Sequence, residues 1–441
     1  MKTWERVLVS ATLWLAGQGV ASAESPPPRL DELEAALSRE ARLSWMVTLA
    51  RTRSPVLAES DARARATRMR AEGAGSLPEP ELKAELWAVP LARPYALDRA
   101  NMWMFGVRQS FPAAGTRQDR ARSLAADADV SEHARRATER ELVYRLRSAY
   151  LAYYEAERAL QIHGEHVALT EQMVAQVRDD YEAGRGSQEA LLSALTELSR
   201  LHTSVASERQ QHATSRYLLN TLMGRATDAP LGPAPALRHR SDEAASAAAL
   251  EAALPSRRPE LAGARSTVRR AEAVADAARH AARRPAFMVG ADYFVMPTMM
   301  DPHAYGAMVS MSLPWLSAER RAEARAAAET LQAERHAAEA THASTRFALH
   351  QALAGLEAAR TSYTLLEREV LPQVTRGLEA SESAFSRGQG GLLALLEARR
   401  SYYQVRLEHS RAEARLLAQL AELELSAGAP AFDVTEQEVA P

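Results

Sequence analysis

Apolar residues recur at alternating spacings of four and three along much of the chain, a pattern that predicts long helices packed along one face. The longest such series lies in a stretch without proline. Its members are Leu142, Leu146, Ala149, Tyr153, Ala156, Leu160, His163, Val167, Thr170, Val174, Val177 and Tyr181. A series of this length predicts a coiled-coil seam. At about 1.5 Å per residue, the helix that carries it is expected to reach on the order of 100 Å.

Two such helices are each followed by a glycine-containing turn, after which a second helix is predicted to run back. The turns contain Gly184, Arg185 and Gly186 in the first half of the chain and Gly388, Gln389 and Gly390 in the second. The predicted helix pairs span about 113–224 and about 318–425. Pro372 lies inside the second pair and predicts a kink or a looser turn, because proline cannot donate a helical hydrogen bond.

Two shorter segments, about 81–111 and about 286–314, change to a period of two, which is typical of strands. One apolar face of the second segment consists of Phe287, Val289, Ala291, Tyr293 and Val295. A turn-rich loop divides each segment, so each predicts a β-hairpin. The strands are close to the roughly ten residues that a tilted transmembrane strand needs. A soluble sheet of two hairpins is the alternative interpretation.

These features occur twice in the same order. Pro55 and Pro259 open helices before the two hairpins, and Pro112 and Pro314 follow the hairpins. The first pair of prolines is 204 residues apart (259 − 55), and the second is 202 residues apart (314 − 112). A period this long indicates a duplicated domain rather than a solenoid. The predicted organisation is a first repeat at 24–240, a second repeat at 241–428 and a disordered tail at 429–441.

The first 23 residues have the pattern of a secretory signal peptide. Lys2 and Arg6 supply a basic start, 7–16 is apolar, and small residues at 21–23 form the expected cleavage site. The apolar run is too short to span a bilayer, so we predict cleavage and export.

Charge and composition exclude several classes of function. The formal net charge is −2, which gives no indication of a nucleic-acid partner. The chain contains no cysteine, so packing alone must hold an exported fold together. It also lacks a Gly-rich phosphate loop, a Gly-x-Ser-x-Gly turn and a His-Glu-x-x-His motif. We therefore expect neither an enzyme nor a resident cofactor.

The strand pattern and the helix pattern together predict an assembly. Four membrane strands cannot close a barrel, because single-chain barrels need at least eight strands and an open edge in lipid leaves backbone groups unpaired. Three chains would supply twelve strands. The predicted fold is therefore mainly α with a small β part: a trimeric α-barrel of long helical hairpins joined to a shared 12-stranded transmembrane β-barrel.

The ordered, duplicated set of motifs resembles the TolC-like outer membrane efflux proteins over nearly the whole chain after the signal peptide. The resemblance rests on the helix starts at Pro55 and Pro259, the prolines after the hairpins, the two glycine turns, and the Leu-Asn-Thr-Leu-Met-Gly ending at 219–224. It implies a homotrimeric exit duct in the outer membrane with a long periplasmic extension. Such a duct passively conducts substrates that an inner membrane pump exports through a periplasmic adaptor.

The resemblance also implies roles for two sets of residues. The six turn residues named above would contact the adaptor. Glu397 corresponds to an acidic position that rings the closed aperture in the family, whereas Ala394 replaces an earlier carboxylate of that pattern. Three Glu397 side chains would line the entrance and attract cations. The alternative is a solvated surface glutamate paired with Arg400 or Arg387.

The second hairpin is rich in methionine and is similar in this respect to the heavy-metal (CzcC/CusC-like) branch of the family. Met299, Met300 and His303 are candidate ligands for a soft metal ion, and ordinary apolar filling of a strand is the alternative interpretation. His163 and His166 lie one turn apart and are expected to be packed histidines rather than metal ligands. The pattern does not indicate the cargo.

A periplasmic coiled-coil scaffold or adaptor without a membrane barrel is the competing functional interpretation. An adaptor would normally contain one helical hairpin flanked by β-rich domains. The duplication predicts two helical hairpins and little other β structure, which favours the exit duct.

Overall fold

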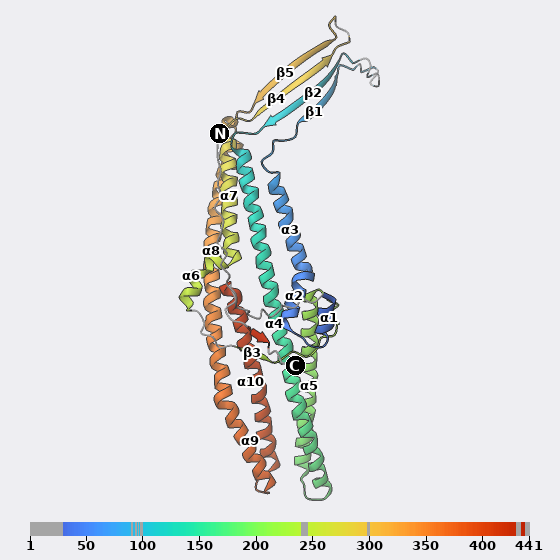
Figure 1. The fold of residues 1–441 in the computed structure, drawn as a ribbon, viewed down its shortest axis with the longest axis vertical. Coiled ribbons are helices and arrows are strands. Elements are labelled where there is room, and N and C mark those ends of the chain that lie inside the picture. The colour runs from blue at the N-terminus through green and yellow to red at the C-terminus, as the bar shows by residue number, and fades with distance from the viewer. Residues whose placement is uncertain are drawn as a thin grey trace, which may run out of the picture.

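The computed structural model describes most of the chain after the predicted signal peptide. The described residues are 30–89, 91, 92, 95, 97, 100–239, 246–297, 300–428 and 434–436. The signal peptide prediction at 1–23 lies outside them. Figure 1 shows an elongated molecule with a β-sheet at one end and two helical hairpins at the other.

The helices of the first repeat follow the predicted plan. They are α1 (Leu30–Leu37), α2 (Leu43–Arg53), α3 (Pro55–Glu72), α4 (Thr116–Glu182) and α5 (Gln188–Met223). Pro55 is the first residue of α3, where the missing N–H removes no intrahelical hydrogen bond. Ser187 caps α5, because its hydroxyl accepts a hydrogen bond from the Ala190 N–H at 3.1 Å.

The second repeat has the same order with one interruption. Its helices are α6 (Ala247–Arg257), α7 (Pro259–Arg283), α8 (Ala318–Leu365), α9 (Leu371–Ser386) and α10 (Leu392–Ala427). A π-helical turn, Leu366–Val370, separates α8 from α9 directly before Pro372. Because Pro372 has no N–H to donate, the preceding turn widens, and the predicted disruption at this proline is confirmed. Among the described residues, no helix combines the length and the apolar character needed to cross a bilayer.

Both predicted hairpins form, and they join into one sheet. The strands are β1 (Glu81–Trp87), β2 (Met102–Phe111), β4 (Phe287–Val295) and β5 (His303–Met311). All neighbours are antiparallel in the order β1-β2-β4-β5, so β2 and β4 fuse the two repeats. Within the described chain, the outer edges of β1 and β5 pair with no other strand.

The strand register gathers the alternating apolar residues on one face. Phe105 lies opposite Tyr293, which in turn lies opposite Tyr305. Val107 is aligned in the same way with Leu82 on one side and Ala291 on the other. This face is open to solvent in a single chain, as the exposed fractions of Leu82 (85%) and Tyr305 (91%) show. The other face contains Lys83, Glu85, Gly106, Arg108, Gly290, Asp292, Gly306 and Ser310.

The main hydrophobic core lies midway along the helices, where α2, α4, α5, α8 and α10 meet. Tyr150 and Tyr153 of α4 are fully buried there, and the Tyr153 hydroxyl donates a hydrogen bond to the Gly232 carbonyl at 2.9 Å. The predicted seam is confirmed along most of its length. Its buried members are Leu142, Leu146, Ala149, Tyr153, Ala156, His163, Thr170, Val174 and Val177.

The predicted tail contains an ordered element. Val434–Glu436 forms a short strand, β6, that pairs antiparallel with β3 (Leu237–His239) from the linker between the repeats. The prediction of a wholly disordered tail is therefore wrong for these three residues. So short a pairing relies on backbone hydrogen bonds and leaves no periodic signal in the sequence.

Candidate functional site

The two glycine turns lie at the same end of the molecule, opposite the sheet (Figure 1). One connects α4 to α5, and the other connects α9 to α10. Their residues are largely exposed. The predicted adaptor-contact residues and the predicted aperture residue are thus brought to one region.

Both turns have the same backbone geometry. Gly184 has φ 71° and Gly388 has φ 72°, values in the left-handed region that favours glycine. The Gly184 N–H donates to the Tyr181 carbonyl at 3.0 Å, and the Gly388 N–H donates to the Phe385 carbonyl at 2.9 Å. These bonds satisfy carbonyls that the helix ends would otherwise leave unpaired. The local geometry therefore requires glycine at both positions.

An apolar cluster joins the two helical hairpins behind their tips. Met173 and Val177 of α4 contact Leu395 of α10, and all three side chains are buried. Leu378 and Phe385 of α9 pack against this cluster and are half-buried. The first turns of α10 are therefore held by apolar contacts within one chain.

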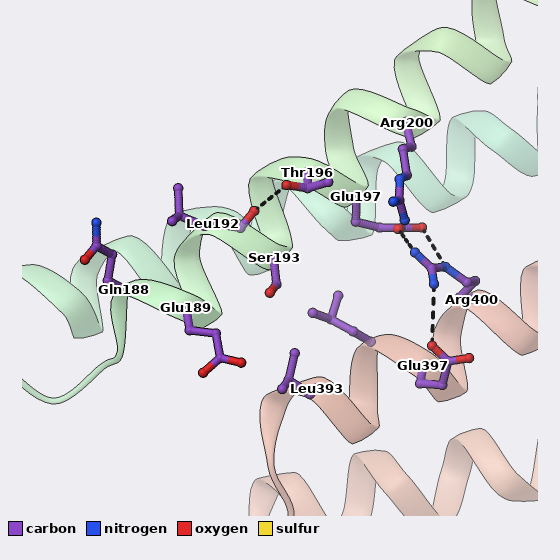
Figure 2. A pocket seen from close by; sticks show the side chains of 11 residues that line it. Gln188, Glu189, Leu192, Ser193, Thr196, Glu197, Arg200, Leu393, Glu397 and Arg400 are labelled. Carbon is purple, nitrogen blue, oxygen red and sulfur yellow. Dashed lines mark hydrogen bonds and ion pairs between the residues drawn. The ribbon is translucent and has the colours of Figure 1, made fainter.

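An ion pair ties the same part of α10 to α5. Figure 2 shows the Arg400 guanidinium facing the Glu197 carboxylate, with hydrogen bonds from two of its nitrogens. Glu197 is buried, and the hydrogen bond with it raises the pKa of Arg400. Because the Glu197 carboxylate is largely removed from water, this pair holds α10 against α5 more firmly than a surface pair would.

Glu397 lies one turn before Arg400 on the same helix. Its Oε2 is 3.6 Å from the Arg400 Nη1, and its side chain is 73% exposed. The other predicted partner, Arg387, instead donates to the Ser383 Oγ at 2.6 Å. The structure thus brings Glu397 together with Arg400 and leaves its carboxylate open to solvent.

A groove of about 910 Å³ separates the start of α5 from the start of α10 (Figure 2). Leu192 and Leu393 form apolar parts of its wall, and their side chains are 54% and 51% exposed. Its charged lining consists of Glu189, Glu197, Glu397, Arg200 and Arg400. The carboxylates outnumber the guanidinium groups by three to two, so the groove favours cations slightly.

Sequence reasoning missed Glu197. The available signal was its position in an apolar series on α5, where Ala194, Glu197 and Leu201 follow at spacings of three and four and are all buried. A carboxylate in such a seam needs a cationic partner, because an unpaired buried charge is costly. Arg400 supplies that partner from a helix about 200 residues later in the chain.

The other sequence candidates are not gathered into a site. Met299 lies outside the described residues, and Met300 is fully exposed. The Nδ1 of His303 lies 2.8 Å from the Tyr293 hydroxyl on the apolar face of the sheet. His163 and His166 are buried, and His166 stacks on Tyr403 with ring centroids 4.2 Å apart. Among the described residues, no group of three or more His, Cys, Asp or Glu side chains is arranged to hold a metal ion.

The sequence of the second repeat matches a known family. Residues 249–429 match the model of the outer membrane efflux protein family. No curated protein sequence matches the chain. The match covers α7 to α10, including the second glycine turn and Glu397.

Solved structures of outer membrane channels have the same fold. A membrane protein from Pseudomonas aeruginosa is 19% identical with a TM-score of 0.77, over 88% of this chain and 94% of that one. The open state of the MtrE outer membrane channel from Neisseria gonorrhoeae is 19% identical with a TM-score of 0.75, over 88% and 89%. CusC is 18% identical with a TM-score of 0.75, over 88% and 92%. The chain is therefore similar in sequence to the outer membrane efflux protein family over residues 249–429, and it has the fold of solved outer membrane channels over 88% of its length.

Proposed function

We propose that three copies of this chain form the outer membrane exit duct of a tripartite efflux system. The sheet is the observation that carries this proposal. Its outward apolar face and its two unpaired edges, β1 and β5, are satisfied together if each β5 pairs with the β1 of a neighbouring copy. Three sheets of four strands would then close a 12-stranded barrel whose apolar face contacts lipid.

The connections between strands and helices support the same assembly. In chain order, α3 leads to β1, β2 leads to α4, α7 leads to β4, and β5 leads to α8. Each strand of the sheet is therefore followed or preceded by a long helix that extends away from it (Figure 1). Closure of the strands into a ring would place these helices in a second ring, and the product is a hollow tube.

The open end of this tube would lie at the glycine turns. We infer that three Glu397 carboxylates, one from each copy, line this aperture, since the Glu397 side chain is exposed and α10 begins only five residues before it. Clustered carboxylates attract cations. The Glu197–Arg400 ion pair and the apolar cluster around Leu395 would fix the start of α10, and with it the position of Glu397.

The adaptor would meet the same end of the tube. Gly184, Arg185 and Gly186, together with Gly388, Gln389 and Gly390, form two exposed turns of equal geometry beside the groove between α5 and α10. The exposed Leu192 and Leu393 of this groove offer apolar contacts for a partner. The duct itself would conduct passively, and an inner membrane pump would supply the energy.

The aperture role of Glu397 can be tested by single-channel recording with Glu397→Gln. We expect the cation preference of the reconstituted channel to fall, because three carboxylates are lost from the entrance. Glu408→Gln is the matched control. It removes a carboxylate from the same helix, about 16 Å further from the tip. Equal selectivity for the wild type and Glu397→Gln would leave Glu397 as a surface partner of Arg400.

A further inference from the structure

The second repeat contains a basic hollow where its helices meet the sheet. This hollow has a volume of about 390 Å³ and lies between the end of α7 and the start of α8. Figure 1 shows that these helix ends lie next to the start of β4 and the end of β5. Its lining residues are Arg279, Ala282, Arg283, Trp315, Arg321, Ala324 and Arg325. The lining thus contains four guanidinium groups, one indole and no carboxylate. We call it the junction hollow.

Two of the four guanidinium groups have partners within the chain. Arg279 pairs with Asp276, whose carboxylate also pairs with Arg122. The Arg321 Nη1 donates to the Trp315 carbonyl at 2.6 Å. Within the described residues, Arg283 and Arg325 form no ion pair with a carboxylate. The junction hollow therefore retains positive charge that the chain itself does not neutralise.

The charge of the surrounding segments agrees with that of the lining. Residues 276–284 and 319–325 together contain six arginines against three acidic residues, a net charge of +3. The whole chain has a net charge of −2, so this concentration of arginine is local. An anionic partner would gain both Coulomb attraction and bidentate hydrogen bonds from the guanidinium groups.

Exposed apolar side chains follow the last strand directly and adjoin the junction hollow. Leu313, Trp315 and Leu316 are 43%, 47% and 72% exposed. Tryptophan is enriched at membrane interfaces, where its ring contacts both the acyl region and the head groups. The junction hollow therefore has arginines in its lining and exposed apolar side chains beside it, a combination that complements an amphiphile with an anionic head.

We propose that the junction hollow binds the phosphate of a phospholipid in the membrane leaflet next to the helices. This proposal rests on the proposed function, which places the sheet in the membrane. Arg283 and Arg325 would bind the phosphate oxygens, while Trp315 and Leu316 would contact the glycerol and acyl regions. An anionic head group would be preferred, because arginines near a membrane surface attract anionic lipids.

Two lining residues of the junction hollow have no equivalent in the first repeat. At the offset of 202 residues that relates the two prolines, Trp315 corresponds to Ala113 and Arg321 corresponds to Asp119. Asp119 is buried and lies 2.6 Å from the Nδ1 of His280 on α7. At these two positions the first repeat thus has a small residue and a buried carboxylate, whereas the second has an exposed indole and an exposed guanidinium.

The test uses the full chain purified in a mild detergent and dihexanoyl phosphatidylglycerol added below its micelle concentration. Native mass spectrometry counts the bound lipid for the wild type, for the double variant Arg283→Gln/Arg325→Gln, and for Arg320→Gln. Arg320 is a matched control, because it pairs with Glu323 on the same helix and does not line the junction hollow. We expect lipid binding to weaken about fivefold for each of the two lining arginines, and to be unchanged in the control.

Equal binding by the wild type and the double variant would overturn the proposal, as would an equal loss in the control. Inorganic phosphate is a separate arm. If it displaces the lipid at equal concentration, the junction hollow is a site for soluble anions and the lipid assignment fails. Fractionation of the same variants separates this proposal from the proposed function: wild-type protein absent from the outer membrane would overturn both, whereas membrane-located protein with unchanged lipid binding would overturn the lipid site alone.

Discussion

The helices that lead to the two glycine turns differ in how much of their surface one chain buries. In the first repeat α4 has 18 buried residues among 67. In the second repeat α8 has five among 48, and α9, which is described throughout, has none among 16. The helix α4 packs against other helices of its own chain along much of its length. The second helix has the same connections but leaves most of its surface exposed in a single chain, as the proposed assembly of three chains would require.

Truncation of one leucine in each helix gives the largest expected contrast. Leu146→Ala empties a fully buried position in the main core, and we expect the free energy of unfolding to fall by about 2–5 kcal/mol. Leu378→Ala on α9 removes a half-buried side chain, and we expect a loss of about 1 kcal/mol. Urea unfolding followed by circular dichroism measures both. Equal losses of stability in the two variants would contradict the difference in burial between α4 and α9. A loss for Leu378→Ala that grows with protein concentration would show that a neighbouring copy covers α9.

The buried His166 of the first repeat should make the stability of the chain depend on pH. Burial against Tyr403 lowers the pKa of His166 from 6.5 to about 4. The unfolded chain therefore binds more protons between these values, so stability rises with pH across this window and falls as the pH decreases from about 6.5 to about 4. We expect this side chain to contribute about 3 kcal/mol of that loss at pH 4.

Unfolding measured at pH 7 and pH 4 tests this expectation. His166→Phe keeps an aromatic ring against Tyr403 and removes the titration, so its stability should fall less between the two pH values than that of the wild type. His336→Phe on α8 is the control, since that side chain is exposed. If His166→Phe and the wild type have the same pH dependence of stability, the protonation of His166 does not cause the loss.

The smallest expected effect is that of helix propensity on stability, and it should be equal in the two repeats. Gly164 in α4 and Gly377 in α9 each have open space where a Cβ would lie. We expect Gly164→Ala and Gly377→Ala each to stabilise the chain by about 0.5–1 kcal/mol, because alanine restricts the unfolded backbone and favours the helix. Thermal unfolding of the two variants is the measurement. A gain at only one of the two sites would mean that the repeats differ in backbone strain as well as in packing.

The sequence predicted those parts of the fold that depend on local periodicity. The seam from Leu142 to Val177 and the alternation in Phe287–Val295 are repeated patterns, and both appear in the structure. Pairings between distant segments left no such pattern. The strands β3 and β6 have three residues each, and the Glu197–Arg400 pair joins α5 to α10. The low burial of α9 within one chain could not be predicted either, because the apolar pattern of a helix does not say which other segment covers it.

The parts of the candidate site that depend on local sequence could also be predicted. Both glycine turns were evident, because Gly184 and Gly388 occupy a backbone region that other residues avoid. The position of Glu397 at the start of α10 follows from the same turn. Its closeness to Arg400 follows from their spacing of three residues on one helix. The groove next to it could not be predicted, since its two walls come from different repeats.

A crosslink between the two edge strands tests the shared sheet most directly. The chain has no cysteine, so Lys83→Cys in β1 and Met308→Cys in β5 supply the only thiols. Purified outer membranes are treated with a short bis-maleimide, and the mass of the product is measured in detergent. We predict a product of three chains, which appears only when both substitutions are present in each chain. A soluble periplasmic monomer that does not crosslink would contradict the exit duct and would favour a periplasmic scaffold.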